Sequence, residues 1–193
     1  GYQVSLEIDP GHTNNSSVGA TGDGGSTGAG TDDSGWNVAI TGSPYDGVSA
    51  GIGYGTETHD NDNAANDADS KFVTGYVNYA VGAATVGLQR SSGTGGSNAT
   101  SSNEVLIYGV SYSINENLAV SYSEMENEYG MGTSKATSGN VRTKEVVEDT
   151  KGLGISYTMG AASVRVLASE ADNAGGTEAN DVEHMEVSLM LAF

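Results

Sequence analysis

Apolar and polar residues alternate one for one along most of this chain. In residues 2–8, for example, apolar side chains occupy the even positions and polar ones the odd positions. Because residues i and i+2 of a strand share a face, this period predicts a sheet with one apolar side. The pattern predicts about ten strands, at 2–8, 36–40, 48–54, 73–81, 84–88, 106–114, 118–122, 153–159, 162–168 and 185–193. Phe72 and Tyr76 disturb the alternation around the fourth strand.

The connections between these segments have a regularity of their own. Short turns are expected at 43–46, 82–83, 115–117 and 160–161, and long polar loops at 10–34, 59–70, 91–103, 130–150 and 171–182. Long and short connections alternate along the chain. This predicts strands that run up and down, with all long loops at one end of the sheet and all short turns at the other. Outer-membrane β-barrels have this asymmetry.

The composition favours a membrane barrel over a soluble β-sandwich. Polar positions of the strands hold mostly Ser, Gly, Thr and Asn, and the chain has only 2 Phe and 1 Trp to fill a core. There is no run of eighteen apolar residues, so no membrane-spanning helix is expected. We therefore predict an all-β fold in one domain, 1–193: a transmembrane antiparallel up-and-down β-barrel.

Aromatic residues gather near the ends of the predicted strands. Such residues form belts where a membrane meets water. Phe72 and Tyr129 are expected near the outer belt as well. The residues assigned to this membrane girdle are Tyr2, Trp36, Tyr54, Tyr79, Tyr112, Tyr157 and Phe193.

The last segment, 186–193, resembles the C-terminal strand of Gram-negative outer-membrane proteins. Those strands end in an aromatic residue with apolar residues at alternate preceding positions, and the barrel assembly machinery reads them. Here the matching residues are Val187, Leu189, Leu191 and Phe193.

Three further segments, 79–88, 108–123 and 157–166, resemble periplasmic hairpins of general diffusion porins of the alphaproteobacterial type. The resemblance implies a location in the bacterial outer membrane, contact with its lipid, and a homotrimer. Those porins have sixteen strands and a constriction formed by an inward-folded third loop. Either this chain supplies the last ten of sixteen strands, with residues missing before Gly1, or it is a ten-stranded barrel.

The polar side of the strands is the expected wall of a channel. These residues are mostly small and neutral, as suits a wet wall, and Arg165 and Glu186 are candidates for an ion pair between neighbouring strands. The expected pore-lining residues are Gln3, Ser5, Glu7, Asn37, Thr74, Asn78, Gln89, Ser111, Ser121, Ser156, Arg165 and Glu186.

The charge balance is strongly acidic, with 7 Lys and Arg against 25 Asp and Glu and a formal net charge of -18. Such a field repels nucleic acid and attracts cations. Either the acids give a cation preference, or they only keep the chain soluble or reflect a salty habitat. The acids expected at the outer mouth are Asp23, Asp32, Asp33, Asp60, Asp62, Asp67 and Asp69.

Candidate chemistry in the loops is sparse. His59 beside Asp60 and Asp62 permits general-base chemistry of the kind used by omptin proteases, and Asp60, Asp62, Asp67 and Asp69 offer oxygen ligands for weak Ca²⁺ binding. A solvated acidic loop explains both features more simply. Cysteine is absent, so disulfides and thiolate metal sites are excluded.

The function predicted from the sequence is a passive, cation-preferring, porin-like channel for small hydrophilic solutes, with no cofactor, no metal and no enzymatic step. Three alternatives stay open: a non-conducting barrel that acts as adhesin, receptor or anchor through its loops, a barrel hydrolase that uses His59, and a soluble acidic calcium-binding β-protein.

Overall fold

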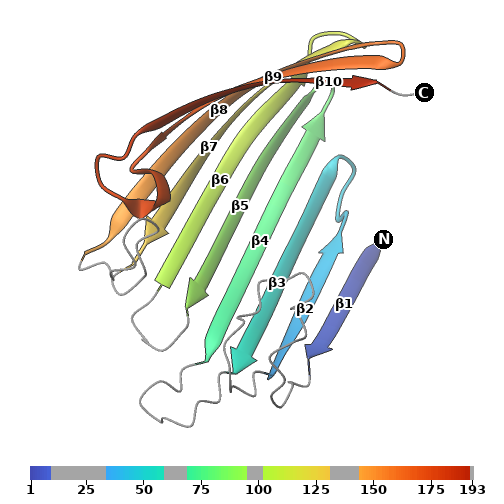
Figure 1. Cartoon of the computed structure of the whole chain (residues 1–193). Coiled ribbons are helices and arrows are strands. Elements are labelled where there is room, and N and C mark those ends of the chain that lie inside the picture. The colour runs from blue at the N-terminus through green and yellow to red at the C-terminus, as the bar shows by residue number, and fades with distance from the viewer. Residues whose placement is uncertain (10–33, 59–68, 95–101, 131–143, 192–193) are drawn as a thin grey trace.

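A computed structural model describes residues 1–9, 34–58, 69–94, 102–130 and 144–191. These segments form ten β-strands in a single sheet, and each strand pairs antiparallel with its neighbour in the chain (Figure 1). The strands are β1 (Tyr2–Asp9), β2 (Ser34–Gly42), β3 (Val48–Thr58), β4 (Ser70–Val81), β5 (Ala84–Thr94), β6 (Ser102–Ser113), β7 (Leu118–Tyr129), β8 (Val146–Met159), β9 (Ala162–Asp172) and β10 (Val182–Leu191). The predicted all-β, up-and-down arrangement is confirmed.

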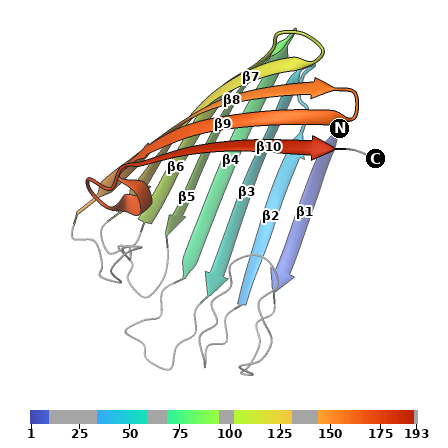
Figure 2. The same cartoon turned by 45° about the horizontal axis from the view of Figure 1, so that its top comes forward.

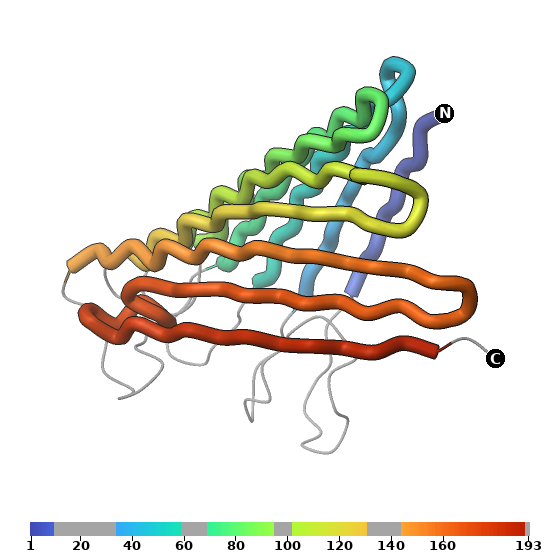
Figure 3. The backbone as a smooth tube through the Cα atoms, turned by 90° about the horizontal axis from the view of Figure 1, so that it is seen from above, coloured from blue at the N-terminus to red at the C-terminus, as the bar shows by residue number. Residues whose placement is uncertain are grey.

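The sheet is strongly curved but not closed. Figures 2 and 3 show it as an open trough, with β1 at one edge and β10 at the other. In the described part of the chain, β1 pairs only with β2 and β10 only with β9. The structure is therefore an open ten-stranded sheet, and its expected closure into a barrel stays a prediction.

Tight turns join the strands at one end of the sheet, which we call the turn end. Gly82 and Gly160 open two-residue turns with φ of 57° and 60°, the positive φ that such hairpin turns need. In the β6–β7 turn, Asn115 Oδ1 accepts hydrogen bonds from the amides of Asn117 and Leu118, both at 2.9 Å. Turn chemistry therefore fixes these hairpins locally.

The opposite end, which we call the loop end, carries the long connections. The connection from β9 to β10 is described and contains a short 3₁₀ helix, Ala174–Gly176. Asn173 organises it: its side-chain amide donates to the carbonyl of Val147 at 3.0 Å, and its Oδ1 accepts from the Ala179 amide at 3.0 Å. Lys144 also pairs with Glu178 at 2.6 Å.

Several strands continue further toward the loop end than the alternation predicts. β5 runs to Thr94 and β8 begins at Val146, both within regions expected to be loop. β7 runs to Tyr129, beyond its predicted end at residue 122. In β7 the extension carries Glu124, Glu126 and Glu128 in place of apolar residues. The hydrogen-bonded ladder continues there after the hydrophobic pattern has ended.

Strand register separates the side chains into two faces, because directly paired residues of an antiparallel sheet point to the same side. Leu6 pairs with Val38, Val38 with Tyr54, and Tyr54 with Val73, so these apolar residues share one face. Glu7, Asn37 and Gly55 share the other. We call the first the convex face, and the second, which carries the hollows described below, the concave face.

Candidate functional site

The convex face is apolar and uncovered. Leu6 is 66% exposed and Leu189 is 64% exposed, at opposite edges of the sheet. Among the described residues, Val146 is the only buried hydrophobic side chain. A sheet without a core cannot gain its stability by hiding apolar groups from water inside itself. An exposed apolar face of this extent marks an interaction surface.

The apolar surface forms a band that begins at the turn end of every strand. On β8 it runs from Met159 through Leu153, and on β9 from Ala162 through Ala168. Each run covers seven residues, which extends over roughly 20 Å along a strand at about 3.3 Å per residue. Closer to the loop end the same face becomes polar on β5 to β10, with Arg90, Glu104, Glu124, Glu126, Glu128, Asp149, Lys151, Glu170, Asp172 and Glu183.

The residues predicted for the membrane girdle and for assembly share this convex face wherever they are described. The register places there Tyr2, Trp36, Tyr54, Tyr79, Tyr112 and Tyr157, and also Val187, Leu189 and Leu191. Trp36 and Tyr54, on neighbouring strands, have ring centroids 5.4 Å apart. Phe193 lies outside the described residues.

Two aromatic residues expected in the outer belt face the other way. Phe72 pairs with Gly55 and Gly93, and Tyr129 pairs with Asn103 and Val146, all on the concave face. Their assignment to the belt was wrong, because nearness to a strand end does not fix the face. The disturbed alternation at Phe72 and Tyr76 was the signal that could have shown it for β4.

The polar residues expected to line a pore all lie on the concave face. The register places there Gln3, Ser5, Glu7, Asn37, Thr74, Asn78, Gln89, Ser111, Ser121, Ser156, Arg165 and Glu186. The structure thus gathers them from all ten strands except β3, which presents mainly glycine: Gly51, Gly53 and Gly55. Whether they line an open pore stays a prediction.

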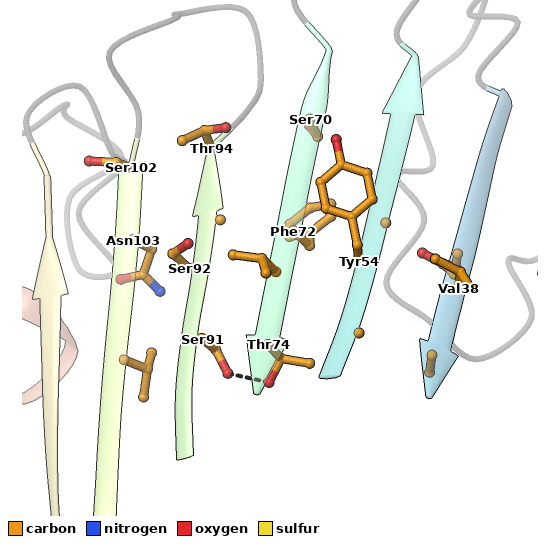
Figure 4. Close-up of a pocket in the computed structure, with 17 residues that line it drawn as sticks. Val38, Tyr54, Ser70, Phe72, Thr74, Ser91, Ser92, Thr94, Ser102 and Asn103 are labelled. Carbon is orange, nitrogen blue, oxygen red and sulfur yellow. Dashed lines mark hydrogen bonds between the residues drawn. The ribbon is translucent and has the colours of Figure 1, made fainter. Parts of the chain in front are cut away.

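Two hollows lie on the concave face. The larger, of about 750 Å³, lies toward the loop end of β2 to β6 and includes Asn37, Phe72, Thr74, Ser91 and Asn103. Figure 4 shows its side chains on neighbouring strands, with Thr74 and Ser91 joined by a hydrogen bond of 2.8 Å. The second, of about 630 Å³, lies toward the turn end and includes Tyr76, Asn78, Gln89 and Ser121. None of the described residues that line either hollow carries a charge.

Charged side chains of the concave face border the larger hollow without lining it: Glu7 accepts a hydrogen bond from Asn37 Nδ2 at 3.5 Å, and Glu57 is paired in the register with Ser70. The acids Glu7, Asp9, Glu57, Glu148 and Glu186 face this side, with Arg165 as a base. The expected ion pair between Arg165 and Glu186 does not form in the described structure. The register pairs Arg165 with Ser188 instead, and Glu186 accepts a hydrogen bond from Ser188 Oγ at 2.8 Å.

On the convex face, the charged region starts with contacts between and along strands β5 to β7. Arg90 on β5 pairs with Glu104 on β6 at 2.5 Å. Glu124 accepts hydrogen bonds from the hydroxyls of both Tyr108 and Tyr122. These contacts mark the line where the apolar band gives way to charge.

The loop residues proposed for chemistry mostly lie outside the described residues. This holds for His59 and for six of the mouth acids, Asp23, Asp32, Asp33, Asp60, Asp62 and Asp67. Asp69 is described and immediately precedes β4. Within the described segments, the structure holds no cluster of three or more His, Asp and Glu suited to a metal, and no helix long and apolar enough to cross a bilayer.

Comparison with known proteins gives no assignment: neither a protein-family model nor a curated protein matches this chain.

Proposed function

We propose that this chain forms a porin-like channel wall, through which small hydrophilic solutes and ions diffuse passively across a bacterial outer membrane. The observation that carries the proposal is the uncovered convex face, where apolar residues of all ten strands form one band at the turn end. A lipid bilayer is the cover that fits such a band, because an outer-membrane barrel presents an apolar belt of about 25 Å flanked by aromatic girdles.

The concave face supports the channel reading. Its small hydroxyl and amide side chains and its glycines leave hollows instead of a packed plug. A wall of this kind suits water and hydrated solutes. No group on it is required to react with the solute, and the proposed transport is passive.

A channel of this kind requires that the free edges of β1 and β10 be paired. Unpaired backbone amides and carbonyls in hydrocarbon cost several kcal/mol each, so a sheet that spans a bilayer must close. β1 and β10 run antiparallel in a ten-stranded up-and-down sheet, so they are suited to pair with each other. Further strands of a larger barrel would serve equally. The homotrimer and the outer-membrane location rest on the porin resemblance alone.

The proposed ion preference is for cations. The concave face carries Glu7, Asp9, Glu57, Glu148 and Glu186 against Arg165, and the whole chain has a net charge of -18. Negative charge at the mouth and wall of a pore raises the local concentration of cations.

The test is single-channel recording of the purified protein in planar bilayers, with a salt gradient across the membrane. Stepwise currents with a reversal potential that favours cations are the expected result. Insertion without current would overturn the channel and favour an anchor or receptor that acts through its loops. Failure to enter detergent or lipid would favour a soluble protein, and a hydrolytic activity lost in His59→Ala would favour the enzyme.

A further inference from the structure

We propose that the concave side of β4 is a binding track for neutral, hydroxyl-rich solutes such as mono- and disaccharides. The inference rests on the proposed channel for its role, because it names the solute that the wall of that channel would select. It is argued from three features of the two hollows: their aromatic rings, their hydrogen-bonding groups and their lack of charge.

The first feature is a pair of rings on one strand. Phe72 belongs to the larger hollow and Tyr76 to the smaller, on the same face of β4. Four residues of strand separate them by about 13 Å along the path from loop end to turn end. The track therefore offers one ring in each hollow.

Glycines on the flanking strands make room for these rings. A Cβ at Gly93 of β5 would lie 3.1 Å from Phe72 Cδ1, and a Cβ at Gly51 of β3 would lie 2.5 Å from Tyr76 Cε1. Each ring thus lies sideways across a neighbouring glycine. Phe72 is nevertheless 50% exposed, so much of its apolar surface stays open to a solute in the hollow.

The second feature is the set of hydrogen-bonding groups around the rings. Thr74, between Phe72 and Tyr76, bonds Ser91 at 2.8 Å, and Gln89 Nε2 donates to Ser91 Oγ at 3.3 Å. Asn78 and Asn103 add amides at either end of the track. Hydroxyl and amide groups both donate and accept, which matches the hydroxyls of a sugar. An apolar ring face beside such groups matches the alternating C–H and O–H surfaces of a pyranose.

The third feature is the lack of charged residues in the lining of the hollows. In a chain with a net charge of -18, the described residues lining both hollows are all uncharged. A charged solute would lose hydration there without gaining an ionic partner among the residues that line the hollows. A purely apolar ligand would leave the hydroxyls and amides without their hydration partners. A neutral polyol meets both conditions.

The test measures maltose binding and ion current separately. Equilibrium dialysis of labelled maltose against the folded protein in detergent needs no conduction, and block of the single-channel current by maltose needs an open pore. We expect binding of maltose, weaker binding of glucosamine and gluconate at the same concentration, and reduced current in its presence.

Variants locate the site. Phe72→Leu keeps an apolar side chain but removes the ring, and it should weaken maltose binding by roughly three- to tenfold. Phe72→Trp should keep it. Tyr79→Leu, on the same strand but the convex face, is the matched control and should leave binding unchanged. Thr74→Val replaces the hydroxyl by a methyl group of similar size, so it tests the hydrogen bond without creating a cavity, and it should also weaken binding.

The outcomes separate this inference from the channel. Current that is insensitive to maltose, with no binding in dialysis, would overturn the sugar track and leave the channel intact. Binding that depends on Phe72 in a protein without current would overturn the channel and leave the track. Equal binding of maltose by Phe72→Leu and the native chain, or equal binding of the charged analogues, would also overturn the track.

Discussion

Tyr76 lies across Gly51 on the neighbouring strand, so closely that a Cβ at Gly51 would fall 2.5 Å from the ring. The same Cβ would fall 2.9 Å from Thr41 Cγ2. The absence of a side chain at position 51 is therefore a packing requirement of the concave wall. Aromatic residues that cover a cross-strand glycine in this way also help to fix register.

Gly51→Ala should consequently destabilise the folded protein. Crowding of this kind costs about 1–3 kcal/mol, and urea unfolding in detergent micelles would measure it. Gly152→Ala is the matched control on the same face, because its Cβ would meet only Ser123 Oγ at an ordinary 3.4 Å. If both variants unfold at the same urea concentration, the packing of Tyr76 on Gly51 does not matter for stability.

Neighbouring residues on β4 test which face meets lipid. Val77 faces the convex side and Asn78 the concave side. Arginine at the lipid-facing midplane of an outer-membrane barrel costs about 2–4 kcal/mol, so Val77→Arg should impair insertion into lipid vesicles. Asn78→Arg should insert normally, because its charge would face water.

Protease protection of vesicle-inserted protein would compare the two arginine variants. Equal insertion of both would contradict a lipid-covered convex face. Impaired insertion of Asn78→Arg alone would place lipid on the concave face and reverse the assignment.

The sequence predicted the ten strands and the face of each expected pore-lining residue because period-two alternation reports the strand and its face together. In β1, the order Tyr2, Gln3, Val4, Ser5 is enough to set both. The prediction was weaker where the chemistry changes along a strand. Glu124, Glu126 and Glu128 continue β7 on the convex face, but three acids carry no hydrophobic signal, so the strand seemed to end early.

The hollows were beyond the reach of the pattern. Phe72 and Tyr76 seemed only to disturb the alternation, and no local rule tells that Gly51 lies beside Tyr76. That relationship depends on the register of β3 with β4, which are separated by a long connection. Closure of the sheet likewise depends on which partner meets the edges of β1 and β10.

The ion pair between Arg90 and Glu104 should contribute little to stability. Their side chains are 71% and 47% exposed, and exposed pairs are typically worth about 0.2–1 kcal/mol. A double-mutant cycle with Arg90→Gln and Glu104→Gln, read by urea unfolding, should give a coupling in that range that shrinks at 1 M NaCl through screening by about a 3 Å Debye length. A larger, salt-insensitive coupling would mean that the apolar environment reaches beyond the band defined here.

On the concave face, the acids should raise the cation preference of an open channel, and Arg165 should lower it. In water, a unit charge about 8 Å from an ion changes its energy by roughly 0.5 kcal/mol, a factor of about two in local concentration. Removing two acids in Glu7→Gln/Glu57→Gln lowers the attraction for cations, so the reversal potential in a salt gradient should move toward zero. Arg165→Gln removes the opposing positive charge and should move the reversal potential away from zero.

Both variants keep a polar side chain on the same face, so unitary conductance serves as the control for an intact pore. If the reversal potential is the same in both variants as in the native protein, these three residues do not face the ion path. The assignment of the concave face as the channel wall would then be wrong.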